Sequence, residues 1–413
     1  MEEKESIDKM RRLLLSAFAC DPTKGSEPGN GWNWAIGLAN KGFEVHCITR
    51  EVSRKGIESK QKPVNLHFHY LQLPIGLEKL YSASQPTMYL YYIIWQWYAY
   101  KMALRLHKQI KFEIAHHVTW GSLQMGSFMY KLNVPFIFGP AGGGQVAPAA
   151  FKKYFSEHWN AEEKRETVTR FMLKYNPACK KMLQKASVVL VSNRDTLEMA
   201  EENGARNVRF TLDAALPTSF FPEQQTIKRT ENEQLKLLWV GRFMPRKGIL
   251  LLLDVMKELE SYAGITLTVI GDGEMKEVFL DKLKEYKLES KVFWKGKVPF
   301  EAVRQYYADH DVFFYTSLRD SCPAQLIEAM AFGMPVVTLN LHGQALIVDD
   351  SRGFRVLCET PEAAIRNLKE AILTLYTHPA LLRSMSIAAY NFAGQQKWEK
   401  KINNIVEQYY PIK

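Results

Sequence analysis

The chain has 413 residues, which is longer than a single core usually extends and therefore favours two domains. Its five cysteines are an odd number without paired spacing, which argues against a disulfide framework or a cysteine-based zinc site and favours a reducing cytoplasm. The net charge of +10 lies almost wholly in the first 213 residues, and such a surplus favours anionic partners such as phosphates, membrane headgroups or nucleic acid.

Near the N-terminus, the apolar run in RRLLLSAFA is too short for a membrane span and has no clear signal-peptide cleavage pattern, so we expect a first buried strand. Apolar strands then alternate with helices, which is typical of parallel sheets covered on both faces. Six strands are expected in the first half: RRLLLSAFA, FEVHCITR, VNLHFHYLQL, EIAHHV, PFIFGP and SVVLVSN. Six more are expected in the second half: LKLLWVGR, ITLTVIGDG, VFWKGKV, VFFYTS, PVVTLN and GFRVL.

The stretch LDAALPTSFFPEQQTIKRTENEQ is polar and contains prolines, so it predicts a linker. We therefore expect an α/β protein with a Rossmann-like domain at 1–215 and a second one at 233–390. The last segment, 391–413, is expected to be helical and to cross back onto the first domain.

Two cations in VGRFMPRKG, Arg242 and Lys247, flank a turn after an apolar strand. Ligands of open α/β sheets bind beyond the carboxyl ends of the strands, where these cations could hold a diphosphate. Two solvated loop charges are the alternative. The chain has neither GxGxxG nor the P-loop pattern, which disfavours an NAD-linked enzyme.

The segment SLRDSCPAQLIEAM carries two acids beside a predicted helix start. Pro323 suits the first helical position, and the free amides of Ala324 and Gln325 would favour an anion such as phosphate. Glu328, one turn later, and Asp320, before the helix, could accept hydrogen bonds from ligand hydroxyls. A helix cap for Asp320 and an ion pair for Glu328 are the alternatives.

A glycosidase pair fits these two acids poorly. Its carboxylates stand roughly 5–9.5 Å apart. A rise of about 1.5 Å per residue puts the two backbones here about 12 Å apart.

The stretches WVGRFMPRKGILLLL, VIGDGEM, VFWKGKV and YADHDVFFYTSLRDSCPAQLIEAMAFGMPVVT resemble the retaining glycosyltransferases of family 4, with the GT-B architecture of two facing Rossmann-like domains. The resemblance implies that Arg242 and Lys247 contact the diphosphate of a nucleotide-sugar. It implies that Asp320 contacts the donor sugar and that Glu328 holds the ribose. The expected donor site also includes Gly271, Val298, Ala324 and Gln325.

Two departures from the family pattern lie in the donor segment. The first acid is Asp320 rather than Glu, and Cys322 and Pro323 replace the usual FG, which removes a backbone donor at the phosphate.

In the first half, SAFACDPTKGSEPGNGWNWAIGLANKGFEV resembles the Gly-rich loop of the same family and a subgroup used for bacterial surface polysaccharides. The resemblance implies close backbone approach to sugar or phosphate, and Asn30 is a candidate cap of the following helix. The glycines concerned are Gly25, Gly29 and Gly31.

EIAHHVTWG places His116 and His117 at a strand end, where the family carries a histidine near the reacting sugar. Only one of them can face the ligand, because neighbours in a strand point to opposite sides, and we prefer His116.

The resemblance implies a hexosyltransferase with retention of configuration, in which the leaving diphosphate helps deprotonate the acceptor. The catalytic residues would be Asp320, His116, Arg242 and Lys247. No divalent ion or other cofactor is expected to be required. The donor would be a UDP-hexose or GDP-mannose and the acceptor a saccharide or a lipid-linked saccharide. A nucleotide-sugar-binding protein without transfer activity is the alternative.

The aromatic segment MYLYYIIWQWYAYKMALRLHKQI is either a core-packing helix or a surface near a lipid-linked acceptor. We expect a cytoplasmic protein, with peripheral contact to the anionic inner face of the cell membrane under the second interpretation. No nucleic-acid partner is expected, since no base-reading motif accompanies the charge.

Overall fold

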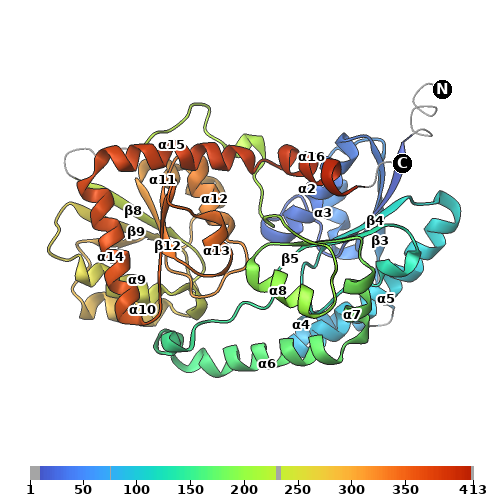
Figure 1. Cartoon of the computed structure of the whole chain (residues 1–413), viewed down its shortest axis with the longest axis horizontal. Coiled ribbons are helices and arrows are strands. Elements are labelled where there is room, and N and C mark those ends of the chain that lie inside the picture. The colour runs from blue at the N-terminus through green and yellow to red at the C-terminus, as the bar shows by residue number, and fades with distance from the viewer. Residues whose placement is uncertain (1–9, 75, 229–233, 411–413) are drawn as a thin grey trace. The chain divides into compact units, whose positions relative to one another are not determined.

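The computed structural model describes residues 10–74, 76–228 and 234–410. The chain forms two compact units (Figure 1). Unit 1 contains Met1–Gly144, Thr167–Ala215 and Trp398–Lys413, and unit 2 contains Gln145–Glu166 and Leu216–Lys397. The expected domain limits at residues 1, 233 and 413 lie outside the described residues.

Unit 1 contains a seven-stranded parallel sheet in the order β3-β2-β1-β4-β5-β6-β7. The middle strands are mostly apolar and are buried on both faces, which is what helices on each side of a parallel sheet require. The strands are β1 (Arg11–Ala17), β2 (Phe43–Arg50), β3 (Leu66–Leu71), β4 (Ile114–Thr119), β5 (Phe136–Ala141), β6 (Val188–Val191) and β7 (Val208–Phe210).

The helices of the first half are α2 (Ser26–Asn40), α3 (Arg54–Glu58), α4 (Leu80–Ala83), α5 (Gln85–Ile110), α6 (Trp159–Tyr175), α7 (Pro177–Lys185) and α8 (Arg194–Glu202). Short 3-10 turns are η1 (Glu51–Ser53), η2 (Leu77–Lys79), η3 (Met129–Leu132) and η4 (Ala149–His158).

Unit 2 contains a six-stranded parallel sheet in the order β10-β9-β8-β11-β12-β13. Its strands are β8 (Leu235–Val240), β9 (Ile265–Ile270), β10 (Val292–Trp294), β11 (Val312–Tyr315), β12 (Val336–Leu339) and β13 (Gly353–Val356). Its helices and turns are η5 (Thr218–Phe220), η6 (Pro245–Lys247), α9 (Ile249–Glu258), α10 (Lys276–Glu285), α11 (Phe300–Asp309), α12 (Ala324–Ala331), α13 (His342–Ile347), α14 (Pro361–Thr377) and α15 (Pro379–Gln395).

Both sheets are doubly wound, because the chain adds strands first on one side of the starting strand and then on the other. The expected pair of Rossmann-like parallel-sheet domains is therefore confirmed, and all twelve expected strands are present. The additional strand, β7, has one buried and two exposed residues, so it carries no apolar run that could predict it.

The expected domain boundary at residue 215 is wrong for residues 145–166, which belong to unit 2. Phe151 and Trp159 of this segment are buried in the same apolar cluster as Trp239 of β8. The Tyr154 hydroxyl donates to Asp254 Oδ2 of α9 at 2.8 Å. These contacts attach the segment to the second sheet.

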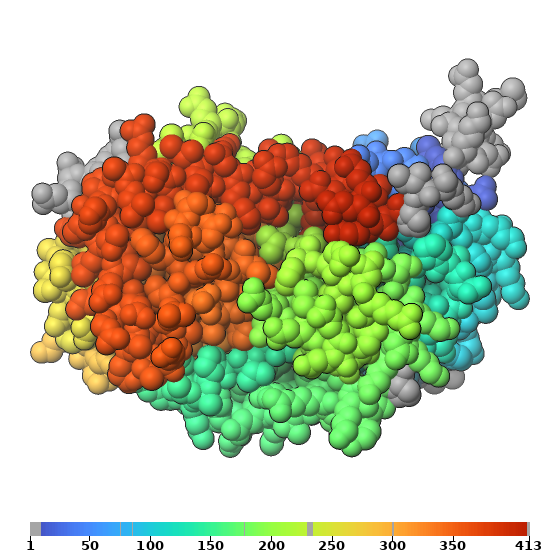
Figure 2. All heavy atoms as spheres, viewed as in Figure 1, coloured from blue at the N-terminus to red at the C-terminus, as the bar shows by residue number. Residues whose placement is uncertain are grey.

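The last described helix, α16 (Trp398–Tyr409), belongs to unit 1. Ile402 packs so closely on α2 that a Cβ added to Gly37 would lie 2.0 Å from its Cδ1. The helix before it, α15, forms part of the surface of unit 2 together with α14, in the orange to red colours of Figure 2. No helix in the described part of the chain has the length and apolar character needed to cross a membrane.

Candidate functional site

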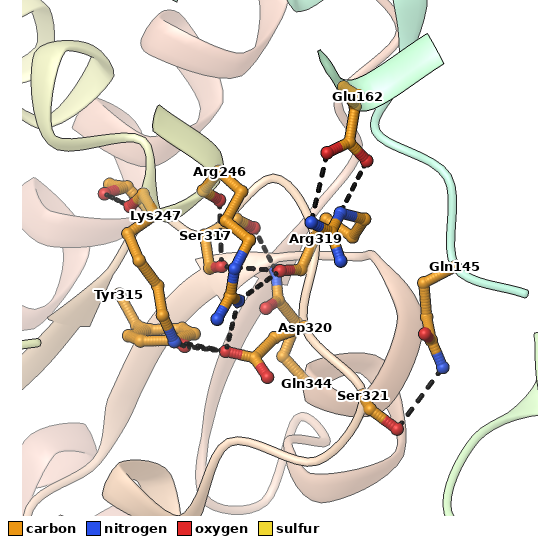
Figure 3. Close-up of polar contacts among 11 residues, drawn as sticks. Gln145, Glu162, Arg246, Lys247, Tyr315, Ser317, Arg319, Asp320, Ser321 and Gln344 are labelled. Atoms are coloured by element: carbon orange, nitrogen blue, oxygen red, sulfur yellow. Dashed lines mark hydrogen bonds and ion pairs between the residues drawn. The ribbon is translucent and has the colours of Figure 1, made fainter. Parts of the chain in front are cut away.

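A polar cluster lies beyond the carboxyl ends of β8 and β11 in unit 2 (Figure 3). The Lys247 ammonium donates to Tyr315 Oη at 2.7 Å and pairs with Asp320 Oδ2. The Tyr315 hydroxyl donates to the same carboxylate oxygen at 2.6 Å, and Arg246 Nη1 lies 3.6 Å from it. Two cations and a phenol thus converge on one carboxylate.

The conformation of Gly248 explains why the loop after β8 meets the loop after β11. Its φ is +64°, and a Cβ at this position would lie 2.1 Å from the carbonyl oxygen of Thr316. Only glycine combines this left-handed turn with so close an approach. The turn η6 is thereby held against the end of β11, which brings Lys247 to Asp320.

The charges in this cluster are strongly coupled. Burial alone would raise the pKa of Asp320, but the charges of Lys247 and Arg246, with hydrogen bonds from Lys247 and Tyr315, lower it to about 2. Burial lowers the pKa of Lys247, while Asp320 opposes that change. The carboxylate is therefore ionised at neutral pH, and a buried cation stands beside it.

Helix α12 begins immediately after this cluster. Pro323 is its N-cap, one residue before the position expected from the sequence, and the helix starts at Ala324. The first amides of a helix have no acceptor within that helix, so Ala324 and Gln325 present donors at this end. Glu328 accepts a hydrogen bond from the Tyr307 hydroxyl at 2.9 Å, and burial raises its pKa to about 6.

The segment 145–166 contacts the loop between β11 and α12. Arg319 Nη2 donates to Glu162 Oε2 at 3.0 Å, and Arg319 Nε lies 2.6 Å from Glu162 Oε1. Gln145 Nε2 donates to Ser321 Oγ at 3.3 Å. Both contacts appear in Figure 3. They hold the loop that carries Asp320.

The other expected donor residues lie in neighbouring loops. Arg242 is exposed after β8, and Val298 is half-buried between β10 and α11. Gly271 follows β9, and a Cβ there would lie 1.8 Å from the carbonyl oxygen of Gly241, so this glycine lets two loops pack together. Our sequence analysis missed Arg246 and Tyr315, although Arg246 adjoins Lys247 and Tyr315 ends a strand.

In unit 1, neither expected histidine is exposed. His116 is 0% exposed, with Nδ1 2.8 Å from the Tyr410 hydroxyl and Nε2 2.7 Å from the carbonyl oxygen of Gly139. Burial lowers its pKa to about 3. His117 is equally buried and contacts Ser16 Oγ at 2.9 Å. Tyr410, the residue after α16, contacts His116, and both histidines are buried, so the preference for His116 over His117 stays a prediction.

The expected Gly-rich loop is mostly helical. Helix α2 starts at Ser26 with Gly25 as its N-cap, so Asn30 lies inside the helix and the cap assignment is wrong. Asn30 Nδ2 donates instead to Asp213 Oδ1 at 3.4 Å. Gly29 and Gly31 both lie in α2, and a Cβ at Gly31 would lie 2.1 Å from the carbonyl oxygen of Ala19. The close approach at Gly31 is to the protein's own backbone.

A second candidate site lies at the carboxyl edge of the unit 1 sheet and centres on Glu27. Its Oε1 accepts the amide of Gly121 at 3.0 Å, and burial raises its pKa to about 7. The neighbouring Trp120 ring is stacked on Phe18 with centroids 5.9 Å apart. The Arg50 guanidinium lies 4.3 Å from the Phe18 ring centroid. Glu27 was missed because the surrounding prolines and glycines indicated a turn.

Comparison with known proteins agrees with the geometry of unit 2. Residues 220–409 match the family described as glycosyl transferases group 1. This stretch, slightly less than half of the chain, is similar to the group 1 glycosyl transferases. The resemblance drawn from the sequence is confirmed at this level, and the assignments to family 4 and to the retaining class remain predictions.

Two curated glycosyltransferases are similar to part of this chain. The chain is 27% identical over 212 residues to the amylovoran biosynthesis glycosyltransferase AmsD of Erwinia amylovora, covering 50% of the chain and 58% of AmsD. It is 27% identical over 162 residues to the GPI3 subunit of the phosphatidylinositol N-acetylglucosaminyltransferase of Saccharomyces cerevisiae, covering 38% of the chain and 36% of that protein. The matches thus span about a third to just over half of these relatives.

Solved structures share the fold over nearly the whole chain. Sucrose-phosphate synthase from Thermosynechococcus elongatus aligns with a TM-score of 0.66 and 18% identity, over 97% of this chain and 98% of that one. HepE of Anabaena in complex with UDP aligns with a TM-score of 0.65 and 14% identity, over 96% and 99%. At these identities the likeness shows the GT-B fold alone.

Proposed function

We propose that this protein transfers a hexose from a nucleotide-diphosphate sugar to a saccharide or lipid-linked acceptor, with retention of configuration, in the synthesis of a bacterial surface polysaccharide. The contact of Lys247 and Arg246 with Asp320 at the start of α12 is the observation that carries this proposal. The stretch similar to the group 1 glycosyl transferases covers these residues.

The donor diphosphate would lie against Lys247, Arg242 and the first amides of α12, because cations and a helix N-terminus both favour an anion. Glu328 would accept hydrogen bonds from the ribose hydroxyls, and Asp320 would contact the sugar. Solved structures of HepE with UDP and with UDP-glucose support a UDP-hexose as the donor. GDP-mannose remains the second candidate.

In the proposed reaction the bond between the sugar and the diphosphate breaks, and a bond to the acceptor oxygen forms on the same face of the sugar. The leaving diphosphate accepts the acceptor proton. Lys247, Arg246 and the amides of Ala324 and Gln325 would stabilise the negative charge that develops on the diphosphate, which is the electrostatic contribution expected to be largest. We expect transfer to persist in the presence of a chelator.

The acceptor would bind at the Glu27 site of unit 1. A carboxylate and an arginine can hydrogen-bond sugar hydroxyls, and aromatic faces such as Trp120 can pack against sugar rings. Glu27, Arg50 and Trp120 provide this combination. The name of AmsD, an amylovoran biosynthesis enzyme, supports a polysaccharide role.

Peripheral membrane contact is proposed for helix α5. Tyr91, Tyr92 and Trp95 on this helix are fully buried, whereas Trp97 is 40% exposed. The ammonium groups of Lys101 and Lys131 lie 5.2 and 5.3 Å from the Trp97 ring centroid. Exposed aromatic rings flanked by lysines suit an anionic headgroup region, so α5 serves both as core and as surface.

An apolar cavity of about 200 Å³ lies beside this surface, large enough to receive part of a lipid chain. It is lined mainly by Ile93, Met125, Phe128, Phe171, Met172 and Tyr175. The cavity supports a lipid-linked acceptor and a place for the protein at the inner face of the cell membrane.

The proposal is tested with the purified full chain and four radiolabelled donors, namely UDP-glucose, UDP-galactose, UDP-N-acetylglucosamine and GDP-mannose. A bound donor raises the melting temperature, and a transferase hydrolyses its donor slowly when water replaces the acceptor. Release of free sugar with its anomeric configuration retained is expected for one donor. A melting shift without any release would favour the nucleotide-sugar-binding alternative, and no shift with any donor would overturn both.

A further inference from the structure

A group of four polar side chains lies on strands β2 and β3, outside the two candidate sites. Glu44 and His46 are two residues apart on β2, and His67 and His69 are two residues apart on β3. Side chains two apart on a strand share a face. The parallel register pairs His46 with His67, and β3 is the edge strand of the sheet.

The donor atoms of three of these residues converge. His46 Nε2 lies 3.2 Å from Glu44 Oε1, and His67 Nε2 lies 4.0 Å from the same oxygen. The three donor atoms all lie within 4.8 Å of one another. Ligand atoms about 2.0–2.1 Å from a tetrahedral metal stand about 3.3 Å apart, so small side-chain rotations would complete this geometry.

Neighbouring groups orient the three donors. His46 Nδ1 lies 3.0 Å from His69 Nε2, so a proton on Nδ1 leaves the lone pair of Nε2 directed at Glu44. Arg12 Nε donates to Glu44 Oε2 at 3.3 Å, which holds the carboxylate and leaves Oε1 toward the imidazoles. The His67 side chain is 41% exposed, so water can reach the fourth coordination position.

We propose that Glu44, His46 and His67 bind one zinc ion, with water as the fourth ligand. Two imidazoles and a carboxylate are a donor set that zinc accepts, whereas magnesium prefers oxygen ligands alone. The ion would join the edge strand β3 to β2 and would thereby stabilise unit 1. This site contains no cysteine, so the cysteine pattern could not predict it. It is separate from the donor site, where no metal is expected.

The test uses untagged full-length protein from which metals have been removed with a chelator. Calorimetric titration with zinc chloride should give saturable binding at about one ion per chain, and magnesium chloride should give none. Zinc should also raise the melting temperature, because it binds the folded state. Absence of saturable zinc binding would overturn the proposal.

Three variants separate this site from other zinc ligands. His67→Gln removes a ligand at a half-exposed position and should weaken zinc binding at least tenfold. His69→Ala removes a neighbour of a ligand and should weaken binding roughly 10–100-fold. His158→Ala, which removes another partly exposed histidine, should bind zinc as the wild type does.

Melting of each variant without zinc shows whether it is folded, and His67→Gln is expected to melt as the wild type does. A folded His67→Gln protein with wild-type zinc affinity would assign the binding to other groups, such as the thiols, and would overturn the proposal.

Discussion

Lys247 is the residue on which the donor proposal depends most directly. Its ammonium is buried, and its described partners are Tyr315 and Asp320. A buried cation without solvent to screen it interacts strongly with an incoming diphosphate.

We predict that Lys247→Ala weakens the affinity for UDP or GDP by about 1.5–3 kcal/mol, the size of a hydrogen bond to a charged group. Isothermal titration of the folded variant measures this loss. Lys257→Ala, which removes a lysine paired with Glu260 on the surface, is the matched control. Equal nucleotide affinity in wild type and Lys247→Ala would show that this lysine does not bind the diphosphate.

The ionised carboxylate of Glu328 is predicted to lower the free energy of unfolding at high pH. Its folded-state pKa is about 6, compared with an ordinary value of 4.5, so the folded protein binds this proton more tightly than the unfolded chain. Its contribution to stability is therefore present below about pH 4.5 and is lost as pH rises through 6. A shift of this size corresponds to about 2 kcal/mol.

Glu328→Gln cannot ionise and keeps an acceptor for the Tyr307 hydroxyl. We predict that it is more stable than the wild type by about 2 kcal/mol at pH 8, and that this gain shrinks at pH 5. Urea denaturation at the two pH values measures the difference. Glu277→Gln, at an exposed position, should show no such pH dependence. A gain that is the same at both pH values would contradict the assigned ionisation.

At the scale of elements, α16 completes the core of unit 1. Ile402 is 1% exposed and packs against α2 at Gly37. We predict that Ile402→Ala lowers the free energy of unfolding by about 2–5 kcal/mol and Ile402→Val by about 0.5–1.5 kcal/mol. Chemical denaturation measures both, and Glu399→Ala at an exposed position of the same helix is the control. A wild-type value for Ile402→Ala would mean that α16 is not part of the core.

Twelve of the thirteen strands could be predicted from the sequence because each contains enough apolar residues to stand out, as in Val188–Val191, whereas β7 does not. Segment 145–166 could not be assigned, because its place depends on pairs such as Tyr154 with Asp254, which are 100 residues apart. Because successive side chains of a strand point to opposite faces, the sequence correctly placed His116 and His117 on opposite sides of β4. Their burial could not be foreseen, since the Tyr410 partner of His116 lies 294 residues later.

For the candidate donor site, the sequence predicted where the residues lie along the fold but not how their side chains pair. Motif spacing placed Lys247, Asp320 and Glu328 in loops and a helix that follow strand ends. The pairing of Asp320 with Lys247 and Arg246 was not predictable, because it depends on the backbone approach at Gly248.

At the scale of the whole molecule, the basic surplus predicts a salt-dependent membrane contact. We expect residues 1–215 to bind anionic vesicles, most strongly near Lys101, Arg105 and Lys108, and to lose this binding as salt shortens the screening length to about 10 Å at 0.1 M and less above it. Sedimentation with anionic and neutral vesicles, using the full chain at low and high salt, measures the effect.

A double variant, Lys101→Gln with Lys131→Gln, should bind anionic vesicles more weakly because both lysines flank Trp97. Lys276→Gln is the control, since this lysine lies over Trp294 in unit 2 at a similar 5.2 Å. The protein could instead pellet equally with anionic and neutral vesicles, or with neither. The basic surplus would then serve solubility only, and a soluble acceptor would be favoured.

The chain passes between the two units at residues 144–145, 166–167, 215–216 and 397–398, so neither unit is one continuous stretch. Trp398, Ile402 and Tyr410 belong to the apolar cluster of unit 1, which also contains Leu13 of β1. On the ribosome the N-terminal sheet therefore emerges long before the residues that close its core. Unit 1 cannot be complete until residues 398–410 have been synthesised, and a chaperone can bind its uncovered apolar face during that interval.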